Sequence, residues 1–302
     1  MNPYLEAARP RTLPAAVAPV LVGTAAAATP LTDVSFVRFV LALLVALALQ
    51  VAVNYANDYF DGVRGVDTEA RVGPRRAVAS GLIAPGDMKR AIAASLLIAA
   101  VAGLALAALA GWELLLVGAA GMLAALGYSG GPRPYASAGL GELFVFVFFG
   151  LVATVGSAYA QDETITLIAV LAAIPMGCLA TALLVVNNLR DIPTDREAGK
   201  VTLAVRLGDA GTRRLYVALV AVAFLLLPVL AVVTSDGWLL APLLSVVVLW
   251  PGVATVRHPA TSGPRLIQAL EATAKGQLAY AVLFAAALAN ATGLTPTAAG
   301  LA

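Results

Sequence analysis

Residues 35–56 read SFVRFVLALLVALALQVAVNYA, an apolar run long enough to cross a lipid bilayer. The hydrocarbon core of a bilayer is about 30 Å thick, and a helix needs about 20 apolar residues to cross it. The run is continuous and rich in Ala, Leu and Val, whereas the lipid-facing strands of a β-barrel alternate apolar and polar residues. This stretch therefore predicts a transmembrane helix and an all-α membrane protein.

Similar runs fill the rest of the chain. Of its 302 residues, 61% are hydrophobic and 12% are charged, while a soluble domain carries about 25% charged residues. The predicted spans are 13–31, 35–56, 88–110, 113–129, 140–160, 165–187, 214–234, 238–256 and 277–293. Frequent Ala and Gly suit close helix packing in a membrane. We predict a polytopic bundle of nine transmembrane helices.

The Lys and Arg residues sort onto one side of this predicted bundle. All of the 19 except Arg38 fall in the N-terminal tail or in loops on the same side. We interpret the following as positive-inside anchors: Arg9, Arg11, Lys89, Arg90, Arg213 and Arg214. The start also lacks the layout of a cleaved secretory signal, because an acid and prolines precede the first apolar run. We expect a bacterial-type inner-membrane protein with a cytoplasmic N-terminus and an external C-terminus.

The remaining sequence excludes several classes of protein. The longest polar segment, roughly 57–88, is too short for a soluble domain, so residues 1–302 are interpreted as a single domain. Cys178, the sole cysteine, lies in a predicted span; it excludes an intrachain disulfide and is expected to be a packing residue. His258 is the only histidine, which excludes His-based zinc sites and Ser-His-Asp triads.

A charged cluster follows the second span. Residues 57–81 read NDYFDGVRGVDTEARVGPRRAVASG. Asn54, Asn57 or Asp58, and Asp61 recur at spacings of three and four, so they share one face of the emerging helix. Asp67 can join them only if the helix has ended before it.

A second cluster follows the sixth span, in NNLRDIPTDREAGKVTLAVRLG at 187–208. Its Asn187-x-x-x-Asp191-x-x-x-Asp195 spacing resembles that of the first cluster. Recurrence four spans apart favours two related halves, as in membrane folds built by duplication. Pro193 predicts a break or a restart of the helix between the two aspartates.

Clustered carboxylates raise one another's pKa unless positive charge lies among them. Mg²⁺ supplies that charge, binding one or two carboxylates together with water and phosphate oxygens. Basic side chains can then hold the other phosphate oxygens. The candidate bases are Arg71, Arg75 or Arg76, Arg190 and Lys200. Charged loops are ordinary at a cytoplasmic face, but acidic residues contribute little to orientation. The two clusters therefore predict a magnesium-diphosphate site on the cytoplasmic side.

Three stretches carry a resemblance to a known family: 57–81, 187–208, and GYSGGPRPYASAGLGE at 127–142. The first two resemble the aspartate-rich motifs of the UbiA-type intramembrane prenyltransferases. Their residues are most similar to those of the menaquinone branch of the family, whose members prenylate 1,4-dihydroxy-2-naphthoate. The resemblance spans the chain, since nine helices with motifs after the second and sixth are also that family's layout.

The resemblance implies Mg²⁺-dependent transfer of a polyprenyl chain from its diphosphate to an aromatic ring, with loss of the ring carboxylate to give demethylmenaquinone. The implied metal-site residues are Asn54, Asn57, Asp58, Asp61, Asp67, Asp191 and Asp195, of which Asp58, Asp61, Asp191 and Asp195 are the expected catalytic set. Arg71, Arg76, Arg190 and Lys200 are the expected diphosphate-binding set. The general family motif would place its last acid at Gly65, so the role of Asp67 as a direct ligand stays open.

Mechanistically, Mg²⁺ and basic side chains would neutralise the leaving diphosphate. The apolar interior would keep water from the allylic cation. Tyr55, Tyr59 or Tyr128 could stabilise that cation through its ring, although each also suits an interfacial aromatic belt. The 127–142 stretch is interpreted as a turn between the fourth and fifth helices. The candidate contacts with acceptor or cation are Tyr59 of the first cluster and Tyr128, Arg133 and Glu142 of this stretch. Glu142 is an acid inside a span, which is usually functional but can also snorkel.

The expected partners are a polyprenyl diphosphate, an aromatic acceptor and membrane lipid, with no nucleic acid. One alternative is a related enzyme with another acceptor, such as 4-hydroxybenzoate, homogentisate or a sugar phosphate. A membrane transporter is the alternative of another class. Transporters usually bind substrate near the bilayer midplane, whereas these acids gather at one face, which favours the enzyme. The prenyl chain length has no linear signature in the sequence.

Overall fold

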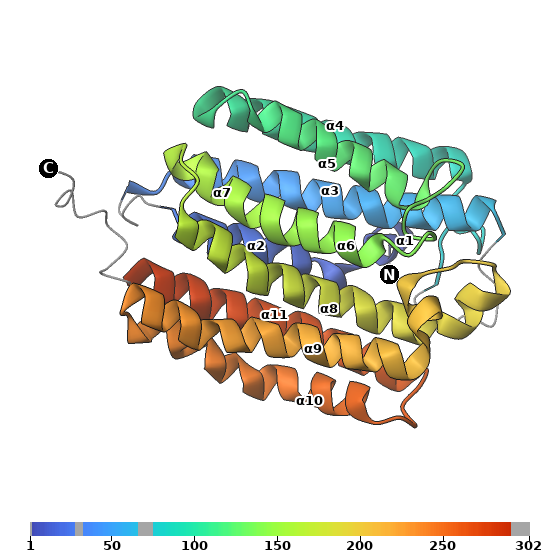
Figure 1. Cartoon of the computed structure of the whole chain (residues 1–302). Helices are drawn as coiled ribbons and strands as arrows, with labels where there is room; N and C mark the ends of the chain where they lie inside the picture. Colours follow the sequence, from blue (N-terminus) through green and yellow to red (C-terminus); the bar gives the residue numbers. More distant parts are fainter. Residues whose placement is uncertain (1, 28–32, 66–74, 291–302) are drawn as a thin grey trace, which may run out of the picture.

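The computed structural model describes residues 2–27, 33–65 and 75–290, and within these ranges it contains helices but no strand. The elements in chain order are α1 (Pro3–Ala7), η1 (Pro10–Thr12), α2 (Pro14–Ala25), α3 (Phe36–Val63), α4 (Pro85–Ala110), α5 (Leu114–Ser129), α6 (Gly141–Val145), η3 (Phe146–Val152), α7 (Ala153–Asp162), α8 (Leu167–Glu197), α9 (Leu203–Thr234), η4 (Gly237–Ser245), α10 (Val246–Arg257) and α11 (Pro264–Asn290). Figure 1 shows the long helices running roughly alongside one another as a bundle. The predicted all-α class is confirmed.

Seven helices of the described residues are long and apolar enough to cross a membrane. The predicted runs 13–31 and 113–129 correspond to α2 and α5, which have 12 and 16 residues. At a rise of 1.5 Å per residue, even the longer of the two extends only about 24 Å. The membrane-type helical bundle is therefore established, and the count of nine crossings stays a prediction.

Two helices continue beyond the predicted spans and carry the charged motifs with them. Helix α3 reaches Val63, so the first motif through Asp61 is helical. Helix α8 runs without interruption to Glu197, so the break predicted at Pro193 is wrong. A proline ring fixes φ near its helical value and removes only one N–H donor. Here the adjacent Thr194 hydroxyl also donates to the Asp191 carbonyl at 3.0 Å within the same turn.

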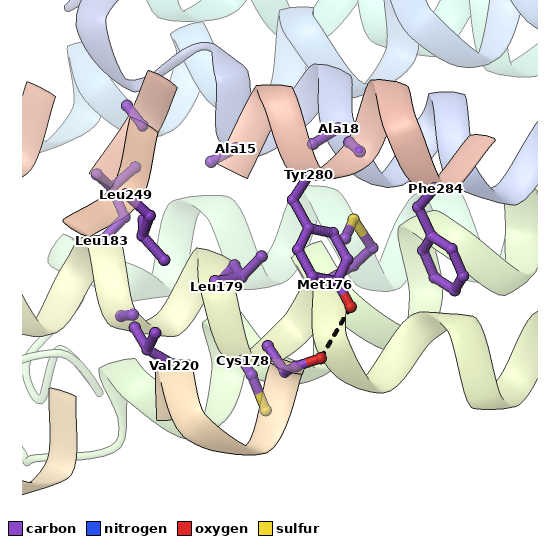
Figure 2. Close-up of a cluster of buried hydrophobic side chains, with 14 of the residues drawn as sticks. Ala15, Ala18, Met176, Cys178, Leu179, Leu183, Val220, Leu249, Tyr280 and Phe284 are labelled. Atoms are coloured by element: carbon purple, nitrogen blue, oxygen red, sulfur yellow. Dashed lines mark hydrogen bonds between the residues drawn. The ribbon is translucent and has the colours of Figure 1, made fainter. Parts of the chain in front are cut away.

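The apolar core surrounds α8, which packs against α2, α7, α9 and α11. Met176, Cys178 and Leu179 of this helix belong to one apolar cluster with Tyr280 and Phe284 of α11 (Figure 2). The hydroxyl of buried Tyr280 donates to the Ala223 carbonyl at 2.8 Å, which satisfies the polar end of the ring. Cys178 is buried in this cluster, in agreement with its expected packing role.

The predicted span 140–160 is one helical segment, Gly141–Asp162. Within it, η3 has π-helical hydrogen bonding, while α6 and α7 on either side are α-helical. A Cβ atom added at Gly150 would lie 2.4 Å from the Cα atom of Gly177 on α8. The two backbones therefore touch, and glycine is required at this crossing. Single π-helical turns frequently occur at functional sites, and this one lies beside the cavity described below.

Arg38, the basic residue predicted to lie opposite all others, has a structural role at its end of the bundle. Its guanidinium donates to the carbonyls of Ala160 and Gln161 at 3.1 and 2.9 Å and contacts the Leu109 carbonyl. It also pairs with Glu163 at 3.1 Å. These carbonyls close the last turns of α4 and α7, where a cation is favourable. Local capping explains this exception to the charge sorting.

Candidate active site

The first motif occupies the last turns of α3. Asn54, Asn57, Asp58 and Asp61 are all buried, with exposed fractions of 9% or less. Spacings of three and four keep them on one helical face, as predicted. Figure 1 shows that this end of α3 and the end of α8 lie at the same end of the bundle.

Asp58 fixes the segment that follows the first motif. Its two carboxylate oxygens accept hydrogen bonds from the backbone amides of Ala77 and Val78, at 2.9 and 2.8 Å. Close approach of this segment requires Gly62, since a Cβ atom there would lie 2.9 Å from the Val78 Cβ atom. The turn thereby brings the preceding residue, Arg76, back over α3.

Asp61 joins the two motifs. One carboxylate oxygen pairs with the Arg76 guanidinium at 2.8 Å, and the other pairs with the Lys200 ammonium at 2.9 Å. Asp61 and Arg76 are almost completely buried. Burying an unpaired carboxylate is costly, so two cations on one acid make an anionic residue tolerable in this position. Residues 139 positions apart in the chain thus share one charged cluster.

The end of α8 directs Lys200 toward this cluster. The helix ends at Glu197, and Gly199 has a positive φ of 70°. This is the usual glycine stop after a helix. It allows the Lys200 amide to donate to the Asp195 carbonyl at 2.8 Å, so the chain turns back and the lysine reaches α3.

Arg190 and Asp191 form the charged centre of the second motif. Two guanidinium nitrogens of Arg190 pair with the two Asp191 oxygens, each at 2.7 Å. Arg190 also donates to the Asn187 side-chain oxygen at 3.0 Å. Asp195 lies one turn further along α8 and accepts a long hydrogen bond from the Thr202 hydroxyl, at 3.4 Å.

An N-terminal strap, defined here as residues 2–13, closes over the first motif. Asn54 donates from its amide nitrogen to the Ala8 carbonyl at 2.9 Å and to the Thr12 hydroxyl at 3.4 Å. Arg11 pairs with Glu271 of α11 at 2.7 Å, which ties the strap to the other side of the bundle. Between these anchors, Arg9 has a left-handed backbone with φ of 53°, a conformation that is uncommon for a non-glycine residue and often found at functional sites.

A cavity of about 420 Å³ begins beneath the strap. Its polar end is lined by Arg9, Asn54, Asn57, Tyr128 and Asn187. The rest of its wall is largely apolar and comes from α2, α3, α4, α5, α8 and the α6–α7 segment. The cavity therefore joins a polar mouth beside the charged cluster to an apolar interior.

The third stretch, residues 127–142, makes the predicted turn between α5 and α6. The Ser129 hydroxyl donates to the Asn57 side-chain oxygen, so the turn is bonded to the first motif. Tyr135 donates its hydroxyl to the Ala124 carbonyl at 2.7 Å. Burial raises the pKa of the Tyr135 hydroxyl above its usual range.

The four expected acceptor or cation contacts separate into two groups. Tyr128 lines the cavity, and buried Glu142 accepts a hydrogen bond at 2.9 Å from Asn188, the neighbour of a cavity residue. Tyr59 lies under the ammonium of Lys89, at 5.3 Å from the ring centroid, and Arg133 is exposed. Neither Tyr59 nor Arg133 is among the residues that line the cavity.

The donor set of the described residues consists of carboxylate and amide oxygens, the hard ligands that Mg²⁺ prefers. Within residues 2–27, 33–65 and 75–290, no group of three or more His, Cys, Asp or Glu side chains converges closely enough to hold a metal. The carboxylates instead pair with Arg76, Arg190 and Lys200. The predicted site residues Asp67 and Arg71 lie outside the described residues.

Comparison with known proteins assigns the chain to a family. The family model of the UbiA prenyltransferase family matches residues 16–268. The chain belongs to the UbiA prenyltransferase family. This finding confirms the family that the aspartate-rich motifs predicted.

Several relatives of this UbiA-family chain carry the same name. A 1,4-dihydroxy-2-naphthoate octaprenyltransferase of Mycobacterium tuberculosis is 46% identical over 286 residues, which cover 95% of this chain and 96% of the relative. Its namesake in Escherichia coli K12 is 40% identical over 298 residues, covering 93% of each chain. The chain thus matches these two relatives over nearly their whole length.

Solved structures show the UbiA fold directly. A UbiA homolog from Archaeoglobus fulgidus bound to GPP and Mg²⁺ superposes with a TM-score of 0.65 at 17% identity, covering 94% of this chain and 99% of that one. The apo structure of a UbiA homolog from Aeropyrum pernix K1 also gives a TM-score of 0.65, at 19% identity over 92% of this chain and 95% of that one. At these identities the likeness shows the shared fold.

Sequence reasoning missed two arginines because it assigned them only to membrane orientation. Arg9 lines the polar end of the cavity. Arg213 is buried, forms a two-point pair with Asp209 at 2.6 and 2.9 Å, and donates to the Val256 carbonyl at 2.7 Å. The left-handed conformation of Arg9 has no signature in the sequence, and the Arg213 contacts depend on how α9 and α10 pack.

Proposed function

We propose that this protein transfers a polyprenyl chain from polyprenyl diphosphate to 1,4-dihydroxy-2-naphthoate, with loss of CO₂, in menaquinone biosynthesis. Two relatives named for this reaction align over 95% and 93% of the chain. The reaction needs a charged site for a diphosphate beside an apolar space for a hydrocarbon chain. The described residues offer both, at one end of the bundle.

The observation that carries the proposal is the shared cluster of Asp61, Arg76 and Lys200. It lies one helical turn beyond Asn57, the last residue of α3 that lines the cavity. A prenyl diphosphate placed here has its charged head among basic residues of both motifs and its tail in the apolar cavity. Arg190 and the predicted Arg71 would complete the basic set.

Asp61, Asp191 and Asp195, with Asn57, are proposed to hold Mg²⁺ once a diphosphate occupies the site. Phosphate oxygens would take over the present contacts of the basic residues and release carboxylate oxygens. Bound there, Mg²⁺ supplies positive charge against the leaving diphosphate. Asp58 and Asn54 are proposed as positioning residues, because they hold the 77–78 segment and the N-terminal strap. The predicted ligand Asp67 stays a proposal.

The basic side chains stabilise the diphosphate as it leaves with the electron pair of the allylic C–O bond. The aromatic ring then supplies the pair for the new C–C bond. Departure of the carboxylate as CO₂ returns an electron pair to the ring, so the product is demethylmenaquinone in its reduced form. The apolar walls keep water from intercepting the cation.

The proposed orientation places the N-terminus and the active site at the cytoplasmic face, the C-terminus outside, and nine helices across the membrane. Its support is the sorting of Lys and Arg, with Arg38 accounted for by its capping contacts. A single domain over residues 1–302 is proposed because the longest polar segment, roughly 57–88, is too short for a soluble domain, and the family match at 16–268 is consistent with it.

The decisive test is product identification. Purified protein in detergent or vesicles is incubated with Mg²⁺, a polyprenyl diphosphate, and in turn 1,4-dihydroxy-2-naphthoate, 4-hydroxybenzoate, homogentisate and a sugar phosphate. We expect mass spectrometry to find prenylated, decarboxylated product with the naphthoate alone. A good rate with another acceptor and none with the naphthoate would overturn the acceptor, and no product from any acceptor would favour transport.

A further inference from the structure

Gln50 is a polar residue in a part of the cavity wall that is otherwise apolar along α3. It lies near the middle of that helix, seven residues before Asn57, which is roughly 10 Å along the helix axis. Its neighbours Leu49 and Val53 line the same cavity. The exposed fraction of Gln50 is 8%. A buried amide at this depth needs hydrogen-bond partners, because neither lipid nor an apolar wall supplies them.

Contacts within the protein satisfy only the nitrogen of the Gln50 amide. Its Nε2 atom donates to the Thr12 hydroxyl at 3.4 Å, which is long for a hydrogen bond. Among the residues that the structure describes, none donates a hydrogen bond to the Oε1 atom of Gln50. A primary amide accepts as well as donates. The oxygen is therefore open to a hydrogen-bond donor on a molecule in the cavity.

Anchoring of the N-terminal strap does not require Gln50. Asn54 also donates to the Thr12 hydroxyl at 3.4 Å, and it holds the strap by a shorter bond to the Ala8 carbonyl at 2.9 Å. The Thr12 hydroxyl in turn donates to the Arg9 carbonyl at 3.0 Å. Through Thr12, the amide of Gln50 lies next to the turn of the strap that carries Arg9.

The proposed acceptor has polar groups that match these two residues. Its 1-hydroxyl is on the carbon next to the carboxylate and can donate to that carboxylate internally. The 4-hydroxyl is across the same ring and has no internal partner, so once buried it needs an acceptor atom from the protein. Arg9 offers a cation for the carboxylate at the polar end of the cavity, and the Gln50 oxygen offers a partner for the 4-hydroxyl.

We propose that Gln50 is a specificity-determining residue, whose side-chain oxygen accepts a hydrogen bond from the 4-hydroxyl of the naphthoate acceptor. The inference rests on the proposed function, because it takes the naphthoate to be the acceptor. An aromatic acid without this hydroxyl would leave the amide oxygen buried and unpaired, which is how a polar pocket rejects an analogue that lacks one group. Gln50 thus selects for a second hydroxyl on the ring.

The test removes the two partners of this hydrogen bond separately and together. Wild type and Gln50→Leu are titrated with 1,4-dihydroxy-2-naphthoate and with 1-hydroxy-2-naphthoate, which lacks only the 4-hydroxyl. Mg²⁺ and an unreactive prenyl thiolodiphosphate are present, and calorimetry gives Kd. In wild type, loss of the hydroxyl should raise Kd by about tenfold or more. In Gln50→Leu both acceptors should bind about equally, as weakly as the analogue binds to wild type.

Gln161→Leu is the matched control. Gln161 has the same exposed fraction of 8%, but it lies near the end of α7, where it accepts from the Ser35 amide at 2.9 Å. This variant should keep the wild-type difference between the two acceptors, whatever happens to its stability. Gln50→Met, with an unbranched side chain, repeats the measurement if Gln50→Leu does not fold, as judged by gel filtration and thermal unfolding.

Three results would overturn the role of Gln50: no difference between the acceptors in wild type, a difference that persists in Gln50→Leu, or equal weakening of both acceptors by that substitution. Product formation separates this failure from failure of the proposed function. If wild type prenylates the naphthoate, the function stands and only the role of Gln50 is lost. A wild type that neither binds nor prenylates the naphthoate would overturn both.

Discussion

The Lys200 ammonium lies 2.9 Å from a carboxylate oxygen of Asp61, and this contact joins the two motifs across 139 positions of the chain. The other oxygen of Asp61 binds Arg76 at 2.8 Å. Without substrate, the acid holds both basic residues where a diphosphate would need them.

Lys200→Met should lower kcat by about 10²–10³-fold, because one charge that stabilises the leaving diphosphate is lost. Lys200→Arg should retain part of the rate, since charge is kept while geometry changes. Steady-state kinetics in detergent provide the measurement. Arg196→Met is the control, as this exposed residue lies on the same helix end. Equal losses in the Lys200 and Arg196 variants would remove Lys200 from the site.

Asp58→Asn should act mainly through stability. The amide side chain keeps one oxygen but presents an N–H group toward the backbone amides of Ala77 and Val78. A buried unsatisfied group costs about 1–3 kcal/mol, so the unfolding temperature should fall and activity with it. The Mg²⁺ concentration for half-maximal rate should not change. Asp87→Asn is the control, because Asp87 pairs with Arg90 on the surface. A large shift in the Mg²⁺ requirement of Asp58→Asn would instead identify Asp58 as a metal ligand.

Arg9→Ala should raise KM for the naphthoate by about tenfold or more, because a charge-assisted hydrogen bond contributes about 1.5–3 kcal/mol. Arg9 lines the polar end of the cavity and would meet the acceptor carboxylate there. The KM for the prenyl donor should change little. Arg11→Ala is the paired control, since Arg11 is 62% exposed and bonds Glu271 at the surface. A rise in donor KM alone would assign Arg9 to the diphosphate.

Gly150→Ala should destabilise the fold by about 1–3 kcal/mol, the usual cost of overpacking. The new methyl group would collide with Gly177 on α8, whose Cα atom lies 2.4 Å from the added Cβ position. Gly156→Ala on the same segment meets no atom within 4 Å, so its stability should match wild type. Thermal unfolding in detergent compares the two. Equal unfolding temperatures would show that η3 and α8 do not cross this closely.

Features that depend on neighbouring residues in the chain were predictable. The shared face of Asn54, Asp58 and Asp61 follows from helical spacing alone, and the structure confirms it. The apolar runs likewise located the helices, because burial in lipid requires continuous apolar sequence. The two aspartate-rich motifs resemble those of a known family, and this resemblance predicted both the family and the location of the diphosphate site.

Features that depend on packing were not predictable. The bond from Asp58 to the 77–78 amides exists only after the chain folds back over Gly62. Pro193 indicated a break, but α8 continues past it to Glu197, and the Thr194 hydroxyl donates to the Asp191 carbonyl within the same turn. Arg9 was assigned to orientation because its charge is visible in the sequence, whereas its place over the cavity depends on the strap held by Asn54.

The most direct test of the shared diphosphate site is a double-mutant cycle on Asp61 and Lys200. Values of kcat/KM are measured for wild type, Asp61→Asn, Lys200→Met and the double variant, with the same donor and acceptor. If both residues act on one diphosphate, the double variant should lose little more than the worse single variant, because residues that act as a unit are strongly non-additive. Losses that simply multiply would show that the two motifs act independently, and would contradict the account.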